Sequence, residues 1–286
     1  MGDLRIAVIA ISLYLVKTLF TPRKTTQNTV TPMKKLAGRS FIITGATRGM
    51  GAGISRLFAE HGACLVLSGR NRDLGSSLQR ELTEKGHRAV FMEGDITLPD
   101  RNRELVDLAL DRFGTLNGVV TNAGMLGLGP VVKLDTEIWH KTVQTNLDSV
   151  FYLLKYAVPH LVRTGNGVAV INASIAAYKS FPNHPAYCAS KAGLVALARQ
   201  VATDYGPHLR INSICPGPVD TPLIHESAAA FPDPGQAVSN AAESTLMKRL
   251  GTPADIANLA LFLASDDSSW ITGSSFTADG GVMANL

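Results

Sequence analysis

Two apolar patterns alternate along residues 36–286. Short apolar runs of strand length occur at 40–44, 64–68, 89–93, 116–121, 168–172, 210–214 and 275–277. The stretches between them repeat apolar residues every three or four positions and predict helices at 54–61, 73–85, 100–113, 136–162, 187–205 and 253–264. This alternation of strands and helices is typical of an α/β domain with a parallel sheet.

Two further segments depart from this pattern. The stretch 222–250 is rich in alanine but interrupted by Phe-Pro-Asp-Pro-Gly at 231–235, so it is only weakly helical. We expect a mobile lid over a substrate site at about 218–250. At the other end, residues 1–35 form a separate apolar segment followed by a linker, and the main folded domain is expected to occupy 36–286.

The N-terminal segment carries an uncharged apolar run at 6–16. This run is short of the about 20 residues that a membrane-spanning helix needs. Three interpretations stay open, in this order: a membrane-associated anchor, a mitochondrial presequence, and a disordered tail. If the segment inserts, the basic residues after it, such as Arg23 and Lys24, would hold the following domain in the cytosol. We therefore expect a cytoplasmic protein, membrane-associated on the cytosolic face, with a mitochondrial location as the alternative.

Composition limits the classes of function. The chain has 286 residues, of which 45% are hydrophobic and 17% charged, so a substantial core can form. The net charge of +4 is modest, and without a dense basic run we expect no nucleic-acid partner. Cys64, Cys188 and Cys215 are far apart and lack metal-ligand spacing, so we expect reduced core thiols and no metal site.

A glycine-rich turn follows the first predicted strand and reads Gly45-Ala46-Thr47-Arg48-Gly49-Met50-Gly51. Glycines let the backbone approach a pyrophosphate, whose charge is met by the free N–H groups of the following helix. The spacing differs from the common G-x-G-x-x-G, and a tight turn alone would also account for it. Its place directly after the first strand of an α/β pattern favours a dinucleotide site.

The end of the second predicted strand indicates which dinucleotide binds. Chains that bind NAD usually have an acid there for the ribose 2′-hydroxyl, whereas this sequence reads Ser68-Gly69-Arg70. Arg70 and Arg48 carry guanidinium groups that suit a 2′-phosphate. The pattern predicts NADP, against the alternative that both arginines are ordinary surface residues. Asp95, past the third strand, either binds an adenine amino group or starts a turn.

A tyrosine and a lysine four residues apart form the candidate acid and base. Tyr187 and Lys191 would share one helix face, so that the ammonium favours the ionised phenol. Ser174, just past the fifth strand, would bind the oxygen whose proton moves. Such a pair occurs by chance in many amphipathic helices, and Asn146 in the long helix is open to a purely structural explanation as well.

Taken together, the motifs resemble a classical short-chain dehydrogenase/reductase over about residues 36–286. The matching positions are Thr44-Gly45-x-x-x-Gly49-x-Gly51, Asn122-Ala123-Gly124, Asn146, Ser174, Tyr187-x-x-x-Lys191 and Pro216-Gly217. The resemblance implies a single Rossmann-type, doubly wound domain with a seven-stranded parallel sheet and helices on both faces. It also implies a homodimer or homotetramer.

The resemblance implies roles for these residues. Tyr187 would be the general acid in carbonyl reduction and the general base in alcohol oxidation, with its pKa lowered by Lys191, which also holds the nicotinamide ribose. Ser174 would orient the substrate oxygen, and Asn146 would position a water that links Lys191 to solvent. The implied cofactor contacts are Gly45, Thr47, Arg48, Gly49, Met50, Gly51, Arg70, Asp95, Ile96, Asn122, Ala123, Gly124, Tyr187, Lys191, Pro216, Gly217, Val219 and Thr221.

The sequence thus predicts an NADP(H)-dependent oxidoreductase that transfers a hydride between the nicotinamide and a small-molecule ketone or secondary alcohol. The substrate pocket is expected from 126–128, 176–184 and 218–250. Its predicted apolar residues, which suggest a hydrophobic substrate, are Phe181, Leu223, Ile224, Phe231 and Met247. Two alternatives stay open: a 3-oxoacyl-thioester, polyketide or steroid reductase, and a non-catalytic NADP-binding regulatory or scaffold protein.

Overall fold

The computed structural model describes residues 34–284 of the chain. The apolar run predicted at 6–16 lies outside the described residues. Among the helices that the structure does describe, none has the length and apolar character needed to cross a membrane.

Seven parallel strands form one sheet in the order β3-β2-β1-β4-β5-β6-β7. They are β1 (Ser40–Thr44), β2 (Cys64–Gly69), β3 (Ala89–Glu93), β4 (Gly118–Thr121), β5 (Gly167–Asn172), β6 (Leu209–Pro216) and β7 (Ser275–Ala278). The strand order reverses between β1 and β4, and open parallel sheets bind ligands at the carboxyl ends of the strands beside such a reversal. The predicted doubly wound α/β fold is confirmed.

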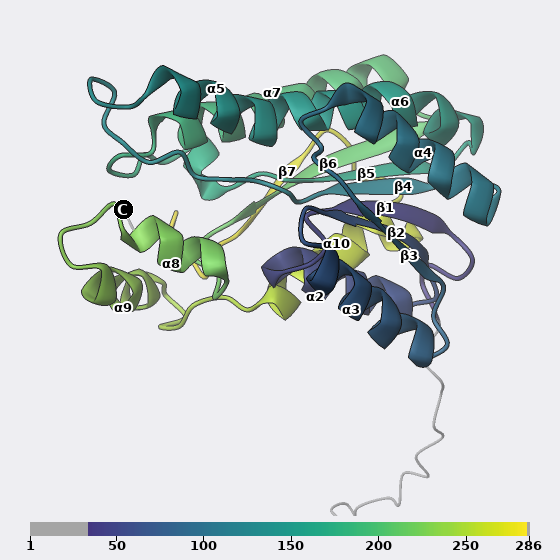
Figure 1. Cartoon of the computed structure of the whole chain (residues 1–286), viewed down its shortest axis with the longest axis horizontal. Coiled ribbons are helices and arrows are strands. Elements are labelled where there is room, and N and C mark those ends of the chain that lie inside the picture. The colour runs from purple at the N-terminus through teal and green to yellow at the C-terminus, as the bar shows by residue number, and fades with distance from the viewer. Residues whose placement is uncertain (1–33, 285–286) are drawn as a thin grey trace, which may run out of the picture. The chain divides into compact units, whose positions relative to one another are not determined.

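Helices cover both faces of the sheet (Figure 1). One layer holds α2 (Gly49–Glu60), α3 (Arg72–Glu84) and α10 (Pro253–Ala264). The other holds α4 (Pro99–Phe113), α5 (Thr136–Val143), α6 (Ser149–Arg163) and α7 (Pro185–Tyr205). A hydrophobic core lies on each face of the sheet. Alternate residues of β1 pack into one core or the other, because successive side chains of a strand point to opposite faces. Phe41 and Ile43 pack into the core under α2 and α10, and Ile42 packs into the core under α4 and α6.

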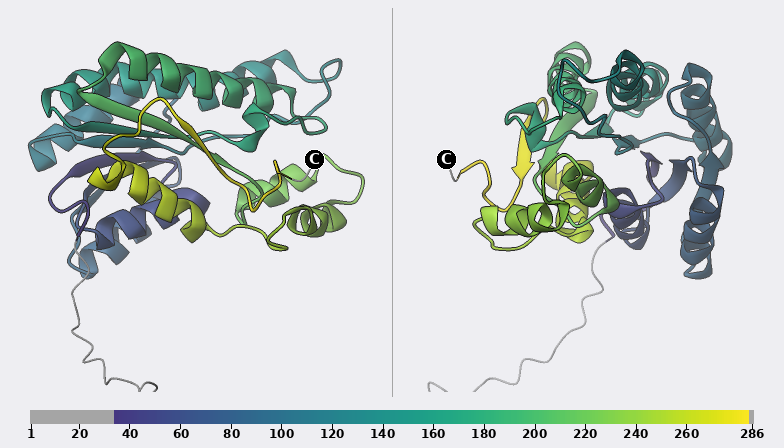
Figure 2. Two further views of the ribbon diagram at one scale, coloured as in Figure 1. Left: turned by 180° about the vertical axis from the view of Figure 1, so that it is seen from behind. Right: turned by 60° about the vertical axis from the view of Figure 1, so that its left-hand side comes forward.

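The predicted lid forms two short helices, α8 (Pro222–Ala228) and α9 (Pro234–Ser244). The chain after β7 runs back beside this segment, as the view from behind shows (Figure 2). The backbone N–H of Leu246 donates to the carbonyl oxygen of Gly280 at 2.8 Å, and this bond holds the chain after β7 against the chain after α9. The C-terminal residues therefore support the segment that follows β6.

The stretch predicted to be helical at 136–162 is helical throughout, but its middle is not a regular α-helix. A π-helical segment, Gln144–Asp148, separates α5 from α6 and contains the buried Asn146. π-Helical turns are rare in proteins, and many of those that do occur lie at functional sites. Several boundaries also differ, two of them at the site: α2 already begins at Gly49, inside the glycine-rich turn, and β6 continues to Pro216, which pairs with Ala278.

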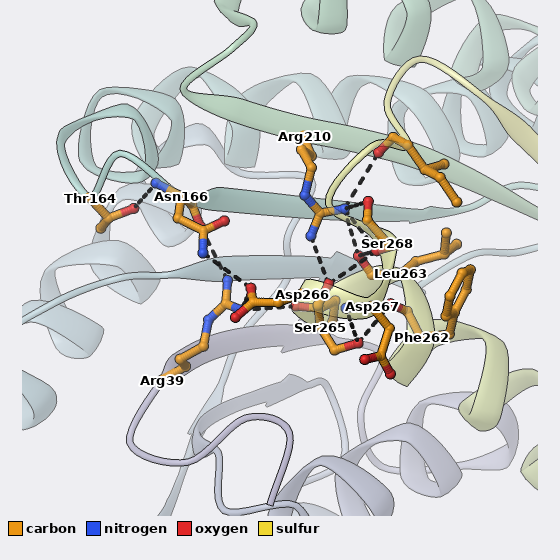
Figure 3. A network of polar contacts seen from close by, with 12 residues as sticks. Arg39, Thr164, Asn166, Arg210, Phe262, Leu263, Ser265, Asp266, Asp267 and Ser268 are labelled. Carbon is orange, nitrogen blue, oxygen red and sulfur yellow. Dashed lines mark hydrogen bonds and ion pairs between the residues drawn. The ribbon is translucent and has the colours of Figure 1, made fainter.

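Two arginines make hydrogen bonds at the end of the sheet where the strands begin, opposite their carboxyl ends (Figure 3). The buried Arg210 of β6 donates to the carbonyl oxygens of Leu263, Ser265 and Ser268 at 3.2, 3.0 and 2.9 Å. Arg39 donates to the carbonyl oxygen of Ala264 at 3.2 Å. These carbonyls belong to the end of α10 and the turn after it, where a helix leaves acceptors unpaired and favours positive charge. The pair of arginines is therefore structural.

Candidate active site

Two cavities meet at the carboxyl ends of the strands. The first has a volume of about 520 Å³ and the second of about 350 Å³. Five residues line both of them: Met50, Ala173, Tyr187, Thr221 and Leu223. The phenolic hydroxyl of Tyr187 can therefore act where ligands bound in the two cavities would meet.

The glycine-rich turn forms one wall of the first cavity. Gly45 and Gly49 have φ angles of +60° and +48°, which favour glycine. A Cβ on Gly45 would lie 2.7 Å from the Cα of Ala123, so the turn and the end of β4 approach backbone to backbone. Gly51 lines neither cavity; a Cβ there would lie 2.1 Å from the carbonyl oxygen of Gly45, so this glycine lets α2 start close to the strand.

Arg48 and Arg70 both line the first cavity and are exposed there. Neither takes part in an ion pair among the residues that the structure describes. Asp95 lines the same cavity, and its carboxylate accepts a hydrogen bond from the backbone N–H of Thr97 at 3.0 Å. Asp95 therefore does start a turn, which was one of the two predicted roles.

The first cavity fits a nicotinamide dinucleotide. The glycines allow a ligand to approach the protein backbone closely. Helix α2 begins at the cavity, and no side chain caps its N–H groups. Arg48 and Arg70 supply positive charge at its rim. Residues 34–284 hold no group of three or more His, Cys, Asp or Glu side chains that could bind a metal ion.

Asparagines connect the strand ends beneath the cavity. The side-chain amide of Asn122 donates to the carbonyl oxygen of Gly45 at 2.9 Å, and that of Asn172 donates to the side-chain oxygen of Asn122 at 2.8 Å. Thr44 accepts from the backbone N–H of Asn122 at 3.1 Å. These bonds link β1, β4 and β5 in a row. Asn172 was not among the predicted site residues, although its place at a strand's carboxyl end could have indicated it.

Lys191 is buried on α7, one turn after Tyr187. Its ammonium donates to the backbone carbonyl oxygen of Asn172 at 2.8 Å and lies 5.6 Å from the centre of the Tyr187 ring. Burial lowers the pKa of Lys191 to about 8, because the charged form loses hydration. The lysine therefore remains mostly protonated at neutral pH.

The expected lowering of the Tyr187 pKa is contradicted. Burial raises the pKa of Tyr187 to about 12, and a hydrogen bond with the Ser174 side chain offsets only part of that rise. Loss of hydration therefore outweighs the favourable effect of nearby polar groups on the phenolate. Tyr187 is consequently protonated at neutral pH and available as a proton donor.

Asn146 makes specific bonds from the π-helical segment. Its side-chain oxygen accepts from the backbone N–H of Met125 at 2.8 Å. Its amide donates to the carbonyl oxygen of Met125 at 2.9 Å and to the hydroxyl of Ser190 at 3.0 Å. Asn146 thus fixes the segment after β4 against the helix that carries Tyr187 and Lys191. The proton relay implied by the family resemblance stays a prediction.

The second cavity is mainly apolar. Its apolar walls include Leu126, Ile175, Phe181, Val219, Leu223, Ile224, Phe231, Val238 and Val282. Ser174 also lines it, beside Tyr187. The prediction that Met247 lines this cavity was wrong: its side chain is 65% exposed, because the chain has turned away from the cavity by that point. Leu128 packs behind Leu126 and Tyr187 instead of reaching the cavity.

The turn before α7 makes hydrogen bonds to α8 and to the residues that follow it. His184 is buried, and its Nε2 lies 2.9 Å from the hydroxyl of Ser227 on α8. Its Nδ1 lies 2.5 Å from the carbonyl oxygen of Pro182, which can only accept, so Nδ1 carries the proton and Nε2 accepts from Ser227. The side-chain amide of Asn183 donates to the carbonyl oxygen of Ala230 at 3.1 Å. These three side chains lie in the ranges 176–184 and 218–250 that were expected to line the substrate pocket, but the bonds that they make were not predicted.

Most of the predicted cofactor residues line the first cavity. They are Gly45, Thr47, Arg48, Gly49, Met50, Arg70, Asp95, Ile96, Asn122, Ala123, Gly124, Tyr187, Lys191 and Thr221. Pro216, Gly217 and Val219 line only the second cavity. The first cavity also contains residues that were not predicted, among them Asn71, Thr145 and Glu226, since helix α8 and the loop after β2 reach it only through the fold.

Comparison with known proteins agrees with this geometry. A family model described as enoyl-(acyl carrier protein) reductase matches residues 45–283. Dehydrogenase/reductase SDR family member 4 of Caenorhabditis elegans is 34% identical over 88% of this chain and 98% of its own length. Cis-4-hydroxycyclohexanecarboxylate dehydrogenase of Sinomonas cyclohexanicum is 34% identical over 87% of this chain and 98% of its own length. The crystal structure of levodione reductase superposes with a TM-score of 0.83 and 29% identity, covering 88% of this chain and all of that one.

The parallel sheet, the glycine-rich first turn and the two joined cavities define a Rossmann-type oxidoreductase. The chain belongs to the short-chain dehydrogenase/reductase family. Members of this family use a nicotinamide cofactor, either NAD or NADP.

Proposed function

We propose that this protein is an NADP(H)-dependent reductase of a ketone, or dehydrogenase of the corresponding secondary alcohol, with an apolar substrate. One observation carries the proposal: Tyr187 is shared by a cavity of about 520 Å³ that fits a dinucleotide and an apolar cavity of about 350 Å³. Ser174 and Lys191 flank it, one toward each cavity.

Each of these residues has a task in the proposed reaction. When bound, the nicotinamide supplies the hydride chemistry. Tyr187 donates its phenolic proton to the carbonyl oxygen of the substrate, and the Ser174 hydroxyl orients that oxygen. Lys191 holds positive charge near the phenol and so stabilises the phenolate that remains after the transfer. Asn146 keeps the helix of Tyr187 and Lys191 in register with the loop after β4.

The protonation state of Tyr187 suits its proposed role as the acid in carbonyl reduction. A pKa of about 12 keeps the phenol protonated at neutral pH, as an acid catalyst requires.

NADP as the cofactor rests on Arg48 and Arg70. Both line the cavity, and β2 ends in Gly69 and Arg70 rather than in the acid that holds a ribose 2′-hydroxyl. Guanidinium groups bind phosphate through paired hydrogen bonds, so the rim suits a 2′-phosphate.

The apolar walls support a substrate with a compact hydrocarbon body. The cavity volume of about 350 Å³ is near the lower end for ligand pockets, which are roughly 300–1,000 Å³. Cis-4-hydroxycyclohexanecarboxylate dehydrogenase is named for a ring alcohol, which agrees with a substrate of this size. A reductase of 3-oxoacyl thioesters is the second candidate, supported by the family model's description and by a 32% identical 3-oxoacyl-[acyl-carrier-protein] reductase of Chlamydia muridarum.

Consumption of NADPH by the purified full-length protein tests the proposal. Cyclic ketones, aldehydes and acyl thioesters are offered in turn, with NADH as the alternative donor. We expect turnover of a cyclic ketone with NADPH that Tyr187→Phe abolishes while NADPH binding is retained. Turnover of thioesters alone would favour the second candidate. Retained cellular function in the Tyr187→Phe variant would favour a scaffold role.

A homodimer or homotetramer and a cytosolic, membrane-associated location remain our proposals for assembly and localisation. Trp139 of α5 and Phe151 of α6 are exposed aromatic side chains on the helix layer formed by α4, α5, α6 and α7, and they support self-association. Sedimentation of the full-length protein and fractionation of cells that express it would test the two proposals separately.

A further inference from the structure

Lys179 is the one charged side chain, apart from the titratable His184 and Tyr187, among the described residues that line the second cavity. Within residues 34–284, no Asp or Glu lines this cavity. The pKa of His184 is lowered by burial, and both of its ring nitrogens already have partners, so it stays neutral at pH 7. A charge on the substrate would therefore meet a cation and no anion.

The other polar side chains of the cavity are bonded within the protein. Ser227 bonds to His184, Ser244 donates to the carbonyl oxygen of Ala241, and Asn240 accepts from Gln236. Ser174 accepts from the backbone N–H of Ala176, and Thr221 donates to the carbonyl oxygen of Val219. These groups satisfy much of their hydrogen-bonding capacity internally and leave the cavity largely apolar.

Lys179 differs from them because its ammonium has neither a hydrogen bond nor an ion pair among the described residues. Its backbone is nevertheless fixed: the N–H of Lys179 donates to the carbonyl oxygen of Ile175 at 2.9 Å, and the thiol of Cys188 points to the carbonyl oxygen of Lys179 at 4.0 Å. The residue is half-buried, and its side chain lines the cavity. A charge held in this way is available to a ligand.

We propose that Lys179 binds a carboxylate of the substrate, so that the preferred substrate is a small keto acid whose apolar body separates the carbonyl from the carboxylate. This inference rests on the proposed function and names its substrate class. An anion cannot enter an apolar cavity favourably without a counter-charge, and Lys179 provides that charge on the wall that also carries Ser174. The carbonyl then lies at Tyr187 and the carboxylate at Lys179.

A matched pair of substrates tests the assignment in the full-length protein. The pair is 4-oxocyclohexanecarboxylate and its uncharged methyl ester. For the wild type, we expect a KM for the acid about 10-fold below that for the ester, as for a hydrogen bond to a charged group. In Lys179→Met the KM for the acid rises about 10-fold while kcat and both ester constants stay unchanged. Lys179→Arg keeps the preference, and Lys179→Glu reverses it.

Salt and a surface variant serve as controls. Added salt should raise the KM for the acid in the wild type, because salt screens the ion pair. It should leave the KM of the Lys179→Met variant for the acid unchanged. Lys155→Met, on α6 and outside both cavities, should behave as the wild type. Equal KM values for acid and ester, or an equal effect of Lys179→Met on both, would overturn the assignment while the proposed function stands. Turnover confined to a neutral acyl thioester would overturn it in favour of the second candidate. Turnover of no carbonyl compound would overturn both proposals.

Discussion

The imidazole of His184 lies edge-on to the ring of Tyr187, with 6.1 Å between the ring centres and an angle of 72° between the planes. The same imidazole accepts a hydrogen bond from Ser227 on α8. His184 therefore connects the proposed proton donor to the helix that forms a wall of both cavities. The position of α8 is linked in this way to the packing of Tyr187, the proposed acid.

Ser227→Ala tests this connection. The substitution removes the donor to a buried ring nitrogen, so α8 should be held less firmly and the substrate bound less tightly. We expect the KM for the ketone to rise about 5-fold with little change in kcat, in keeping with the loss of one hydrogen bond. Ser244→Ala is the matched control, because Ser244 lines the same cavity but bonds within α9. An unchanged KM in Ser227→Ala would show that the bond does not position α8.

Tyr187→Phe removes the proposed acid while keeping the ring that packs on His184. General acid catalysis contributes about 100- to 10,000-fold, so kcat should fall by that factor. Binding of NADPH, followed by fluorescence titration, should remain within a few-fold of the wild type. Tyr205→Phe, at the exposed end of the same helix, is the control and should retain full activity. Substantial turnover by Tyr187→Phe would assign the proton transfer to another group.

The pH dependence of reduction should follow Lys191. Its pKa is lowered to about 8, so the ammonium is present below that pH and is lost above it. Tyr187, with a pKa raised to about 12, stays protonated through the same range. We expect kcat/KM to fall above about pH 8 in the wild type. In Lys191→Arg, where the charge persists, the fall should disappear even if the rate is lower. An identical profile for both proteins would mean that another group controls the alkaline limb.

Arg48→Ala and Arg70→Ala should each weaken the preference for NADPH. Each loses a charged hydrogen bond to the 2′-phosphate, which predicts a rise of about 10-fold in the KM for NADPH. The KM for NADH should not change. Arg72→Ala is the control, because Arg72 is exposed on the neighbouring helix but does not line the cavity. A wild-type protein that prefers NADH would contradict both assignments.

Arg210→Met should reduce stability without affecting catalysis. The substitution leaves several carbonyl oxygens at the end of α10 without their donor, as Figure 3 illustrates. We expect the free energy of unfolding in urea to fall by about 3 kcal/mol, with unchanged KM values in the protein that remains folded. Arg199→Met, on the exposed surface of α7, should have little effect. A large change in KM would show that this edge of the sheet communicates with the cavities.

Much of the fold follows from local pattern. Strand-length apolar runs alternate with helical spacing, and seven parallel strands result. The positions around the first cavity were also predictable, because they lie in loops directly after strands, and parallel strands end at one edge of the sheet. Asn122 and Asn146 accordingly occupy the places that the motifs indicated.

Local pattern did not reveal the π-helical segment at 144–148. Nothing in the apolar spacing of 136–162 distinguishes a wide turn from a regular helix, since the wide turn is held by contacts of Asn146 with Met125 and Ser190. Similarly, the charge of Lys191 predicted a lowered pKa for Tyr187, whereas the degree of burial, which depends on the whole fold, determined the direction.

By itself, the sequence determined the class of fold, the dinucleotide turn and the identity of the candidate acid, because each depends on residue type and on spacing within one element or loop. The tertiary structure alone decided which residues form the second cavity, which of its polar groups are already bonded, and that Lys179 has no partner among the described residues. Those properties depend on packing between residues far apart in the chain, such as Phe181, Ser227 and Val282.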